Sequence, residues 1–244
     1  MGAYIGTEIV NSGLVLHLDA ANPKSYPGTG TTWGDLSGNN NYGTLTNGPT
    51  FSTANNGSCV FDGVNDYARI NNFSNDLGPS LSICCWVNPV TMTVSQSGGE
   101  YLNWIINKRN TTTPNTNSWQ LITANSKIRF DMWGISNTVV SPSGLAQATG
   151  EFTLQLNEWQ YICVSTSKSN GGSFNTYYNS QLNFSGTLTG DYGNTTKPID
   201  IGKTGWGAGF YWNGSVSDIQ IYDRALSAQE ISQNFEATRG RYGI

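Results

Sequence analysis

Carboxylates and a single histidine are the side chains of this sequence that could carry acid–base chemistry. Hydrolysis of a glycosidic bond needs two carboxyl groups that flank the scissile bond. No two glutamates lie two residues apart, the spacing that would place both on one face of a strand. The glutamates are Glu8, Glu100, Glu151, Glu158, Glu230 and Glu236. A carboxylate pair assembled from different strands is left open, but the sequence favours a protein that is not an enzyme.

His17 is the only histidine, so any Ser-His-Asp or Cys-His arrangement would have to include it. It lies in a run in which Leu14, Leu16 and Leu18 alternate with other residues, as in a strand with one buried face. His17 is therefore expected on the polar face, as an ordinary surface or cleft histidine.

The four cysteines are Cys59, Cys84, Cys85 and Cys163. No CxxC pair is present, so a cysteine zinc site is not expected. Free cysteine packs as a small apolar side chain. We therefore expect four buried free thiols.

The composition excludes several classes of partner. Only 11% of the 244 residues are charged, and the net charge is −4. Without a basic cluster the chain is not expected to bind nucleic acid. No apolar stretch approaches the roughly 20 residues needed to cross a bilayer, so no membrane insertion is expected. The opening MGAYIGTEIVNSG has no secretion-signal pattern, which predicts synthesis in a cytosol.

Short strand-like runs recur along the chain between Gly, Asn, Pro and Ser residues. This pattern predicts an all-β fold, a two-sheet antiparallel sandwich. One domain is expected over residues 13–244, with residues 1–12 as an N-terminal arm. The expected strands are Leu14–Leu18, Asn65–Ile70, Leu81–Val87, Trp104–Lys108, Trp119–Thr123, Ile128–Trp133, Trp159–Ser165, Phe174–Tyr178, Ile199–Gly202 and Val216–Tyr222.

One short helix is expected after the last strand. Ser227 and Glu230 have the spacing of a reciprocal capping box, in which Ser227 is the N-cap. Leu226 and Ile231 then form a hydrophobic staple across the helix start. Ile231 and Phe235 lie four residues apart and give the helix an apolar stripe. We expect this helix to latch onto the sandwich.

Several segments, in the same order, resemble laminin-G-like domains, the concanavalin A-like lectin/glucanase jelly rolls. The segments are DLSGNNNYGTLTNGPTF (35–51), CVFDGVNDYARI (59–70), SLSICCWVNP (80–89), EWQYICVS (158–165) and PIDIGKTGWGAGFYWNGSVSDIQIY (198–222). The ending NGSVSDIQIYDRALSAQEISQNF resembles the final strand and helix of these domains. The resemblance covers about residues 13–240 and implies a concanavalin A-like jelly roll. Enzymes on this fold carry a Glu-x-Asp-x-Glu strand motif, which this chain lacks.

A narrower resemblance is to laminin-G-like structural proteins of tailed bacteriophages, marine and cyanobacterial ones in particular. It rests on GLVLHLDAANPKSYPGTGTTWGDLSGNNNYGTLTNGPTF and on the ending FEATRGRYGI. This resemblance implies a virion location, with capsid decoration or a place in a tail fibre. The implied partners are other virion proteins, further copies of this chain and cell-surface glycans involved in host attachment.

The family resemblance also implies a structural calcium ion. Calcium takes six to eight oxygen ligands, and the candidates are Asp35, Asp62, Asp66 and Asp218. The alternative is that these are turn residues, as is common for an Asp before Gly such as Asp62. Family members often have two acidic residues before the last strand, whereas this chain has Ser217-Asp218, which weakens a site that would use both.

Aromatic residues near glycines are the candidates for contact with a sugar or a partner protein. The segment 204–212 carries Trp206, Phe210, Tyr211 and Trp212 among glycines, and Trp33 is a second candidate. The alternative is that these rings close one end of the sandwich.

Three functions follow from these features. The first is a non-catalytic virion structural protein that displays a lectin-like jelly roll and contacts glycans. The second is a carbohydrate-binding module for host polysaccharide. The third, a glycoside hydrolase, has the least support, because the expected carboxylate motif is missing.

Overall fold

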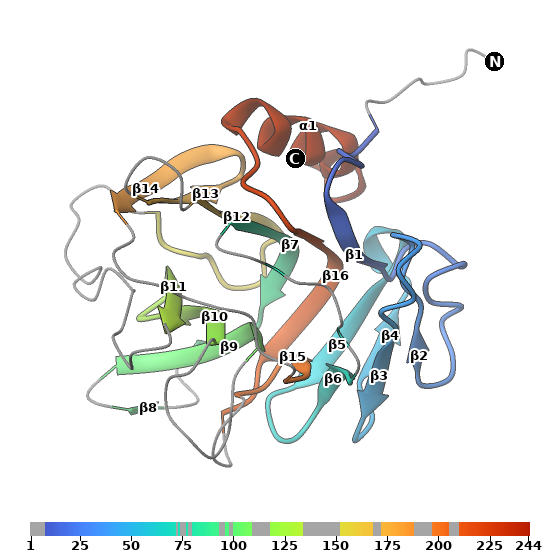
Figure 1. Ribbon diagram of the computed structural model, residues 1–244. Helices are drawn as coiled ribbons and strands as arrows, with labels where there is room; N and C mark the ends of the chain where they lie inside the picture. The colour runs from blue at the N-terminus through green and yellow to red at the C-terminus, as the bar shows by residue number, and fades with distance from the viewer. Residues whose placement is uncertain are drawn as a thin grey trace.

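The computed structural model describes residues 8–71, 73, 77, 80–92, 96–97, 100–108, 118–133, 152–167, 172–187, 197–204 and 210–244. Within these ranges the chain forms two antiparallel sheets and one short C-terminal helix (Figure 1). The expected all-β jelly-roll sandwich is therefore confirmed. No helix in the described ranges has the length and apolar character needed to cross a membrane.

The first sheet, sheet A, has the strand order β14-β13-β12-β7-β16-β5-β4, and β1 pairs with β16 beside this path. Its strands are β1 (Leu14–Asp19), β4 (Thr50–Ser52), β5 (Ser58–Asp62), β7 (Leu81–Pro89), β12 (Gln160–Ser167), β13 (Ser173–Tyr178), β14 (Gln181–Thr187) and β16 (Asn213–Tyr222). The first half of β16 pairs with β5 and its second half with β1. The first and last strands of the domain therefore lie side by side.

The second sheet, sheet B, has the order β11-β10-β9-β15-β6-β3-β2, and the short strand β8 pairs with β9. Its strands are β2 (Thr32–Trp33), β3 (Gly43–Thr46), β6 (Tyr67–Ile70), β8 (Gln96–Ser97), β9 (Glu100–Lys108), β10 (Ser118–Ala124), β11 (Lys127–Trp133) and β15 (Ile199–Ile201). A register shift in β10–β9 pairing between Leu121 and Ile122 marks a bulge.

The main core lies between the two sheets and follows from strand alternation. Ile199 and Ile201 are fully buried in it, and Asp200 between them is on the opposite face of β15. In β1 the same alternation buries Leu16 and Leu18 in the core and places His17 on the outer face of sheet A. The sequence pattern therefore determines which polar side chains each sheet presents outward.

A second apolar layer lies between the outer face of sheet A and α1 (Ala228–Thr238). Ser227 accepts a hydrogen bond from the Glu230 backbone, and the Glu230 side chain accepts one from the Ser227 backbone, which confirms the capping box. Phe235 stacks on Trp86 with ring centroids 5.6 Å apart, and Ile231 is fully buried. The expected latch is thus a helix that covers sheet A. A 3-10 turn, η4 (Arg239–Arg241), follows it, and another, η1 (Ala54–Asn56), precedes β5.

The part of the expected N-terminal arm that the structure describes is attached to this helix. The Val10 backbone N–H donates to Asn234 Oδ1 at 2.8 Å, and the Tyr222 hydroxyl donates to the Val10 carbonyl at 2.9 Å. Val10 is buried in the layer under α1. Residues 8–12 therefore pack on the domain, whereas residues 1–7 of the arm lie outside the described residues.

The expectation of four free thiols is wrong for one pair. Cys84 and Cys163 are opposite each other on β7 and β12 and form a disulfide. Cys59 and Cys85 are buried free thiols, as expected. Neighbouring strands bring Cys84 and Cys163 together across 79 residues of sequence, a pairing that spacing alone does not show.

Candidate functional site

The outer face of sheet B carries one polar side chain from each of seven neighbouring strands. Strand register aligns them in a single line, which we call the polar row. From β11 to β2 its members are Asp131, Gln120, Asn107, Asp200, Arg69, Thr44 and Thr32. In-register neighbours on one face of a sheet lie close enough to interact. The row therefore crosses the strands from one edge of the sheet to the other.

Ion pairs and hydrogen bonds fix the side chains of the polar row. The Arg69 guanidinium donates to both carboxylate oxygens of Asp200, at 2.6 and 2.8 Å. Gln120 Nε2 donates to Asp131 Oδ2 at 2.7 Å, and Arg129 Nε donates to Asp131 Oδ1 at 2.9 Å. Both carboxylates of the row are thus paired with arginine, which pre-orients the polar groups around them.

Exposure increases along the row from β11 to β2. The side chains from Asp131 to Asp200 are buried, the Arg69 side chain is 31% exposed, and Thr44 and Thr32 are exposed. Only the end formed by β6, β3 and β2 can therefore meet a ligand directly. We call this the open end of the polar row.

Aromatic residues flank the polar row. Trp104 Nε1 donates to Gln120 Oε1 at 2.9 Å, and the Trp104 ring lies 5.0 Å from the ring of Phe210. Nearer the open end, Lys203 Nζ lies 3.9 Å from the centroid of the Tyr67 ring, a cation–π contact. One face of the Tyr67 ring is therefore occupied by a cation.

The structure separates the aromatic residues that the sequence singled out. Phe210 and Tyr211 are half-buried beside the row, and the Tyr211 backbone forms an isolated β-bridge with Lys203. Trp33 and Trp212 are fully buried in the core, so their expected role in a surface contact is wrong. Trp33 points inward from β2, and Trp212 lies in the core directly before β16, which supports the alternative of core packing. Trp206 lies outside the described residues.

The predicted calcium ligand Asp35 organises a loop. Its Oδ1 accepts from the backbone N–H groups of His17 and Ser37, both at 2.9 Å. Its Oδ2 accepts from the Asn41 backbone at 2.9 Å and from the Ser37 hydroxyl at 2.8 Å. The hydrogen bond from His17 ties the segment after β2 to β1, and the other three hold the turn around Asp35 together.

Asp62 and Asp66 act within one hairpin. Asp62 Oδ1 accepts from the Val64 backbone at 2.8 Å, and Asp66 Oδ2 accepts from the Asp62 backbone at 3.2 Å. The backbone hydrogen bond from Val64 is the main cause that lowers the pKa of Asp62. These are the contacts of a turn, the alternative considered for Asp62. Calcium binding stays a prediction for these residues.

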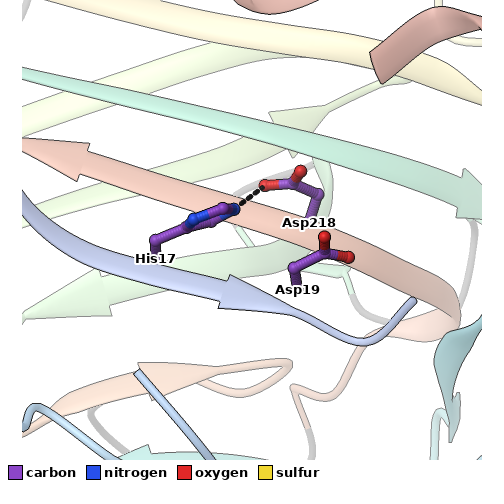
Figure 2. Close-up of side chains that lie close together, drawn as sticks. All are labelled: His17, Asp19 and Asp218. Atoms are coloured by element: carbon purple, nitrogen blue, oxygen red, sulfur yellow. Dashed lines mark ion pairs between the residues drawn. The ribbon is translucent and has the colours of Figure 1, made fainter. Parts of the chain in front are cut away.

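Asp218, the fourth predicted ligand, lies with two residues that the sequence did not single out as ligands. Figure 2 shows His17 and Asp19 on β1 and Asp218 on the adjacent strand β16. Within the described ranges, this is the only group of at least three His, Cys, Asp or Glu residues whose ligand atoms are close enough to share a metal ion. The spacing of His17-x-Asp19 was a visible signal, but the role of Asp218 depends on β1–β16 register.

Burial and neighbouring charges shift the pKa values of His17 and Asp19. Burial alone lowers the pKa of His17, but the charge of Asp218 and the contact with its carboxylate raise it more, so the pKa lies above the ordinary 6.5. The pKa of Asp19 is raised by burial and by the charge of Asp218, against the opposing effect of Arg241. Arg241 Nη1 contacts both Asp19 oxygens at 2.9 Å.

The carboxylates of the polar row are too far apart for glycoside hydrolysis. Asp131 is on β11 and Asp200 on β15, with β10 and β9 between them. Three interstrand spacings amount to about 14 Å, whereas the two carboxyl groups of glycosidases lie roughly 5–9.5 Å apart. This pair therefore does not have the geometry of a hydrolytic site.

Two antiparallel sheets that enclose a common apolar core define a jelly-roll sandwich. The chain belongs to the concanavalin A-like lectin/glucanases superfamily, whose Laminin_G_3 model matches residues 62–232. No curated protein matches the chain.

Solved structures with the same fold include binding domains. Domain 4 of AbnA, a GH43 extracellular arabinanase from Geobacillus stearothermophilus solved with arabinotriose, is similar with a TM-score of 0.64 at 17% identity over 91% of this chain and 98% of that one. The ligand-binding domain of botulinum neurotoxin serotype D, solved with N-acetylneuraminic acid, is similar with a TM-score of 0.65 at 18% identity over 93% of this chain. The chain spans about half the length of the toxin binding domains that it matches, 51% in this case.

Proposed function

We propose that this chain is a non-catalytic glycan-binding protein and that the open end of the polar row contacts the glycan. The observation that carries the proposal is the in-register row itself. At its open end, Thr44 is the register neighbour of Arg69, and Thr32 is the register neighbour of Thr44. Asp200 fixes the orientation of Arg69. The glycan complexes of the arabinanase domain and of the toxin domain support this class of ligand.

The open end suits the chemistry of a sugar. Sugar hydroxyls both donate and accept hydrogen bonds, as the threonine hydroxyls do. The bidentate ion pair holds the Arg69 guanidinium in place before any ligand arrives, which reduces the ordering cost of binding. Lys203 adds a positive charge next to Tyr67, so glycans that carry carboxylates are expected to bind better than neutral ones.

A glycan array with matched variants tests this proposal. Thr32→Ala combined with Thr44→Ala removes two exposed hydroxyls without disturbing the core and is expected to reduce glycan binding at least about tenfold, since two lost hydrogen bonds at about 1 kcal/mol each suffice. The control is Thr50→Ala, an exposed threonine on β4 of the other sheet. No binding by the unmodified chain, or equal binding by the double variant, would contradict the proposal.

We further propose that the protein acts as a virion structural protein of a bacteriophage, in a capsid decoration or a tail fibre, and that it assembles with other copies and with virion proteins. The support is the sequence resemblance of residues 13–51 and 235–244.

Deletion of residues 1–7 tests attachment without removing Val10, which packs under α1. The deletion is expected to abolish incorporation into particles while the melting temperature stays unchanged. Normal incorporation of the truncated chain would count against residues 1–7 as the attachment point. If electron microscopy finds no copy of the protein on the particles, the proposed virion location is wrong.

A further inference from the structure

Two buried carboxylates lie directly opposite each other where β1 meets β16. Asp19 and Asp218 are register partners, and their residues are only 2% and 1% exposed. Like charges in opposite positions on neighbouring strands destabilise a sheet, and burial increases the cost of each charge. This position in the fold therefore requires cations.

Arg241 satisfies only one of the two carboxylates. Both of its hydrogen bonds at this site go to Asp19. Asp218 Oδ1 accepts a hydrogen bond from Gln220 Nε2 at 3.1 Å, but Asp218 Oδ2 is buried and has no hydrogen-bond partner among the described residues. His17 Nε2 is a second such atom, and it lies 3.5 Å from Asp218 Oδ1. Two polar atoms in one small space are thus left without hydrogen bonds.

We propose that His17, Asp19 and Asp218 bind one divalent transition-metal ion, for which zinc is the best match. Their ligand atoms lie within 4.8 Å of one another, and the side chains converge between the two strands (Figure 2). One imidazole nitrogen with two carboxylate oxygens is a donor set that zinc accepts, with water in the fourth position. Calcium prefers six to eight oxygens, so the imidazole favours a transition metal over calcium.

Neighbouring groups already orient these three ligands. Gln220 holds Asp218 through Oδ1 and leaves Oδ2 for the metal. Arg241 holds Asp19, and the His17 backbone N–H donates to Asp35 Oδ1 at 2.9 Å, which fixes β1 at the ligand. Supporting hydrogen bonds of this kind are typical of metal ligands in proteins. The side chains of His17 and Arg241 are 13% and 30% exposed, which leaves an entry path beside them.

The ion would join the first strand to the last strand of the domain, next to the turn η4 that follows α1. A ligand that binds only the folded state raises its stability. The ion would therefore stabilise the pairing of β1 with β16, at a place separate from the polar row on the other sheet. Its presence or absence does not bear on glycan binding.

Metal titration of the chelator-stripped full chain tests the proposal. Zinc competes with the proton for His17 Nε2, so the titration is run at mildly alkaline pH. Calorimetry is expected to show one zinc equivalent per chain, with a raised melting temperature, and weaker or no binding of calcium and magnesium. His17→Gln and Asp218→Asn are each expected to weaken zinc binding at least about tenfold, while Glu236→Gln, an exposed carboxylate on α1, leaves it unchanged.

X-ray absorption of the zinc-loaded unmodified chain provides a readout that does not depend on whether the variants fold. A shell of nitrogen and oxygen ligands with imidazole scattering is expected. The proposal is overturned if the unmodified chain binds no zinc, if it prefers calcium, if the shell contains sulfur, or if folded His17→Gln binds zinc as tightly as the unmodified chain.

Discussion

Two arginine–carboxylate pairs of the same length differ in the burial of the carboxylate. Arg69 Nε lies 2.6 Å from Asp200, whose side chain is 4% exposed, and Arg239 Nε lies 2.6 Å from Glu236, which is 48% exposed. Removal of a hydrogen-bond partner from a buried charge costs more than removal of a solvated one. The length of an ion pair alone therefore does not show how much the pair stabilises the fold.

Arg69→Met keeps an unbranched apolar stem but leaves Asp200 buried without its bidentate partner. We expect the free energy of unfolding to fall by about 1–3 kcal/mol or more. The matched control, Arg239→Met, is expected to change it by no more than about 1 kcal/mol. Urea denaturation followed by tryptophan fluorescence measures both, and equal losses in the two variants would contradict the importance of burial.

At the residue scale, the sequence indicated chemistry-bearing residues but not their partners. Asp200 and Arg69 are 131 positions apart and meet only because β15 pairs with β6. The same holds for Asp19 and Asp218 on β1 and β16. Partners of this kind depend on strand register, which the alternation of a single strand does not specify.

The sequence contains all the local signals that define the start of α1. Glu230 accepts from the Ser227 backbone at 2.9 Å and pairs with Arg224, with Nη2 to Oε1 at 2.6 Å. The hydrogen bond from Arg224 is the main cause that lowers the pKa of Glu230 from 4.5 to about 2. The capping box could be predicted because it depends only on contacts within four residues.

This pKa shift predicts a pH dependence of stability. Because the folded pKa is below the unfolded one, the contact stabilises the fold fully above about pH 4.5 and is lost as the pH falls toward 2. The pair is partly exposed, so its contribution is at most about 1 kcal/mol. Thermal melts of the native chain and Glu230→Gln are expected to differ at neutral pH and to converge in acid. A constant difference across this pH range would contradict the assignment.

Strands with clear alternation were predictable, and short or polar ones were not. The runs at Leu14–Leu18 and Leu81–Val87 correspond to β1 and β7. The edge strand β14 (Gln181–Thr187) is largely exposed, and β2 (Thr32–Trp33) has two residues. Their place in a sheet comes from the neighbouring strand rather than from their own pattern.

At the scale of the whole molecule, the Cys84–Cys163 disulfide joins two neighbouring strands below α1. Replacement of both cysteines by alanine is expected to lower the free energy of unfolding by about 2–4 kcal/mol. Under denaturing conditions without reductant, thiol titration is expected to find Cys59 and Cys85 only. Four reactive thiols in the unreduced chain would contradict the crosslink.

The pairing of β1 with β16 has a mechanical consequence. Leu14 at the start of β1 lies opposite Tyr222 at the end of β16, so the outer ends of both strands are at the same edge. Antiparallel hydrogen bonds run perpendicular to the strands, and a force that pulls these two ends apart loads the bonds one at a time, as in a zipper. When force is applied at Leu14 and Tyr222, the pairing of β1 with β16 is therefore expected to open first at these two residues. The opening then reaches the paired positions of His17 and Asp19. A metal ion bound there would raise the force needed to separate the two strands further.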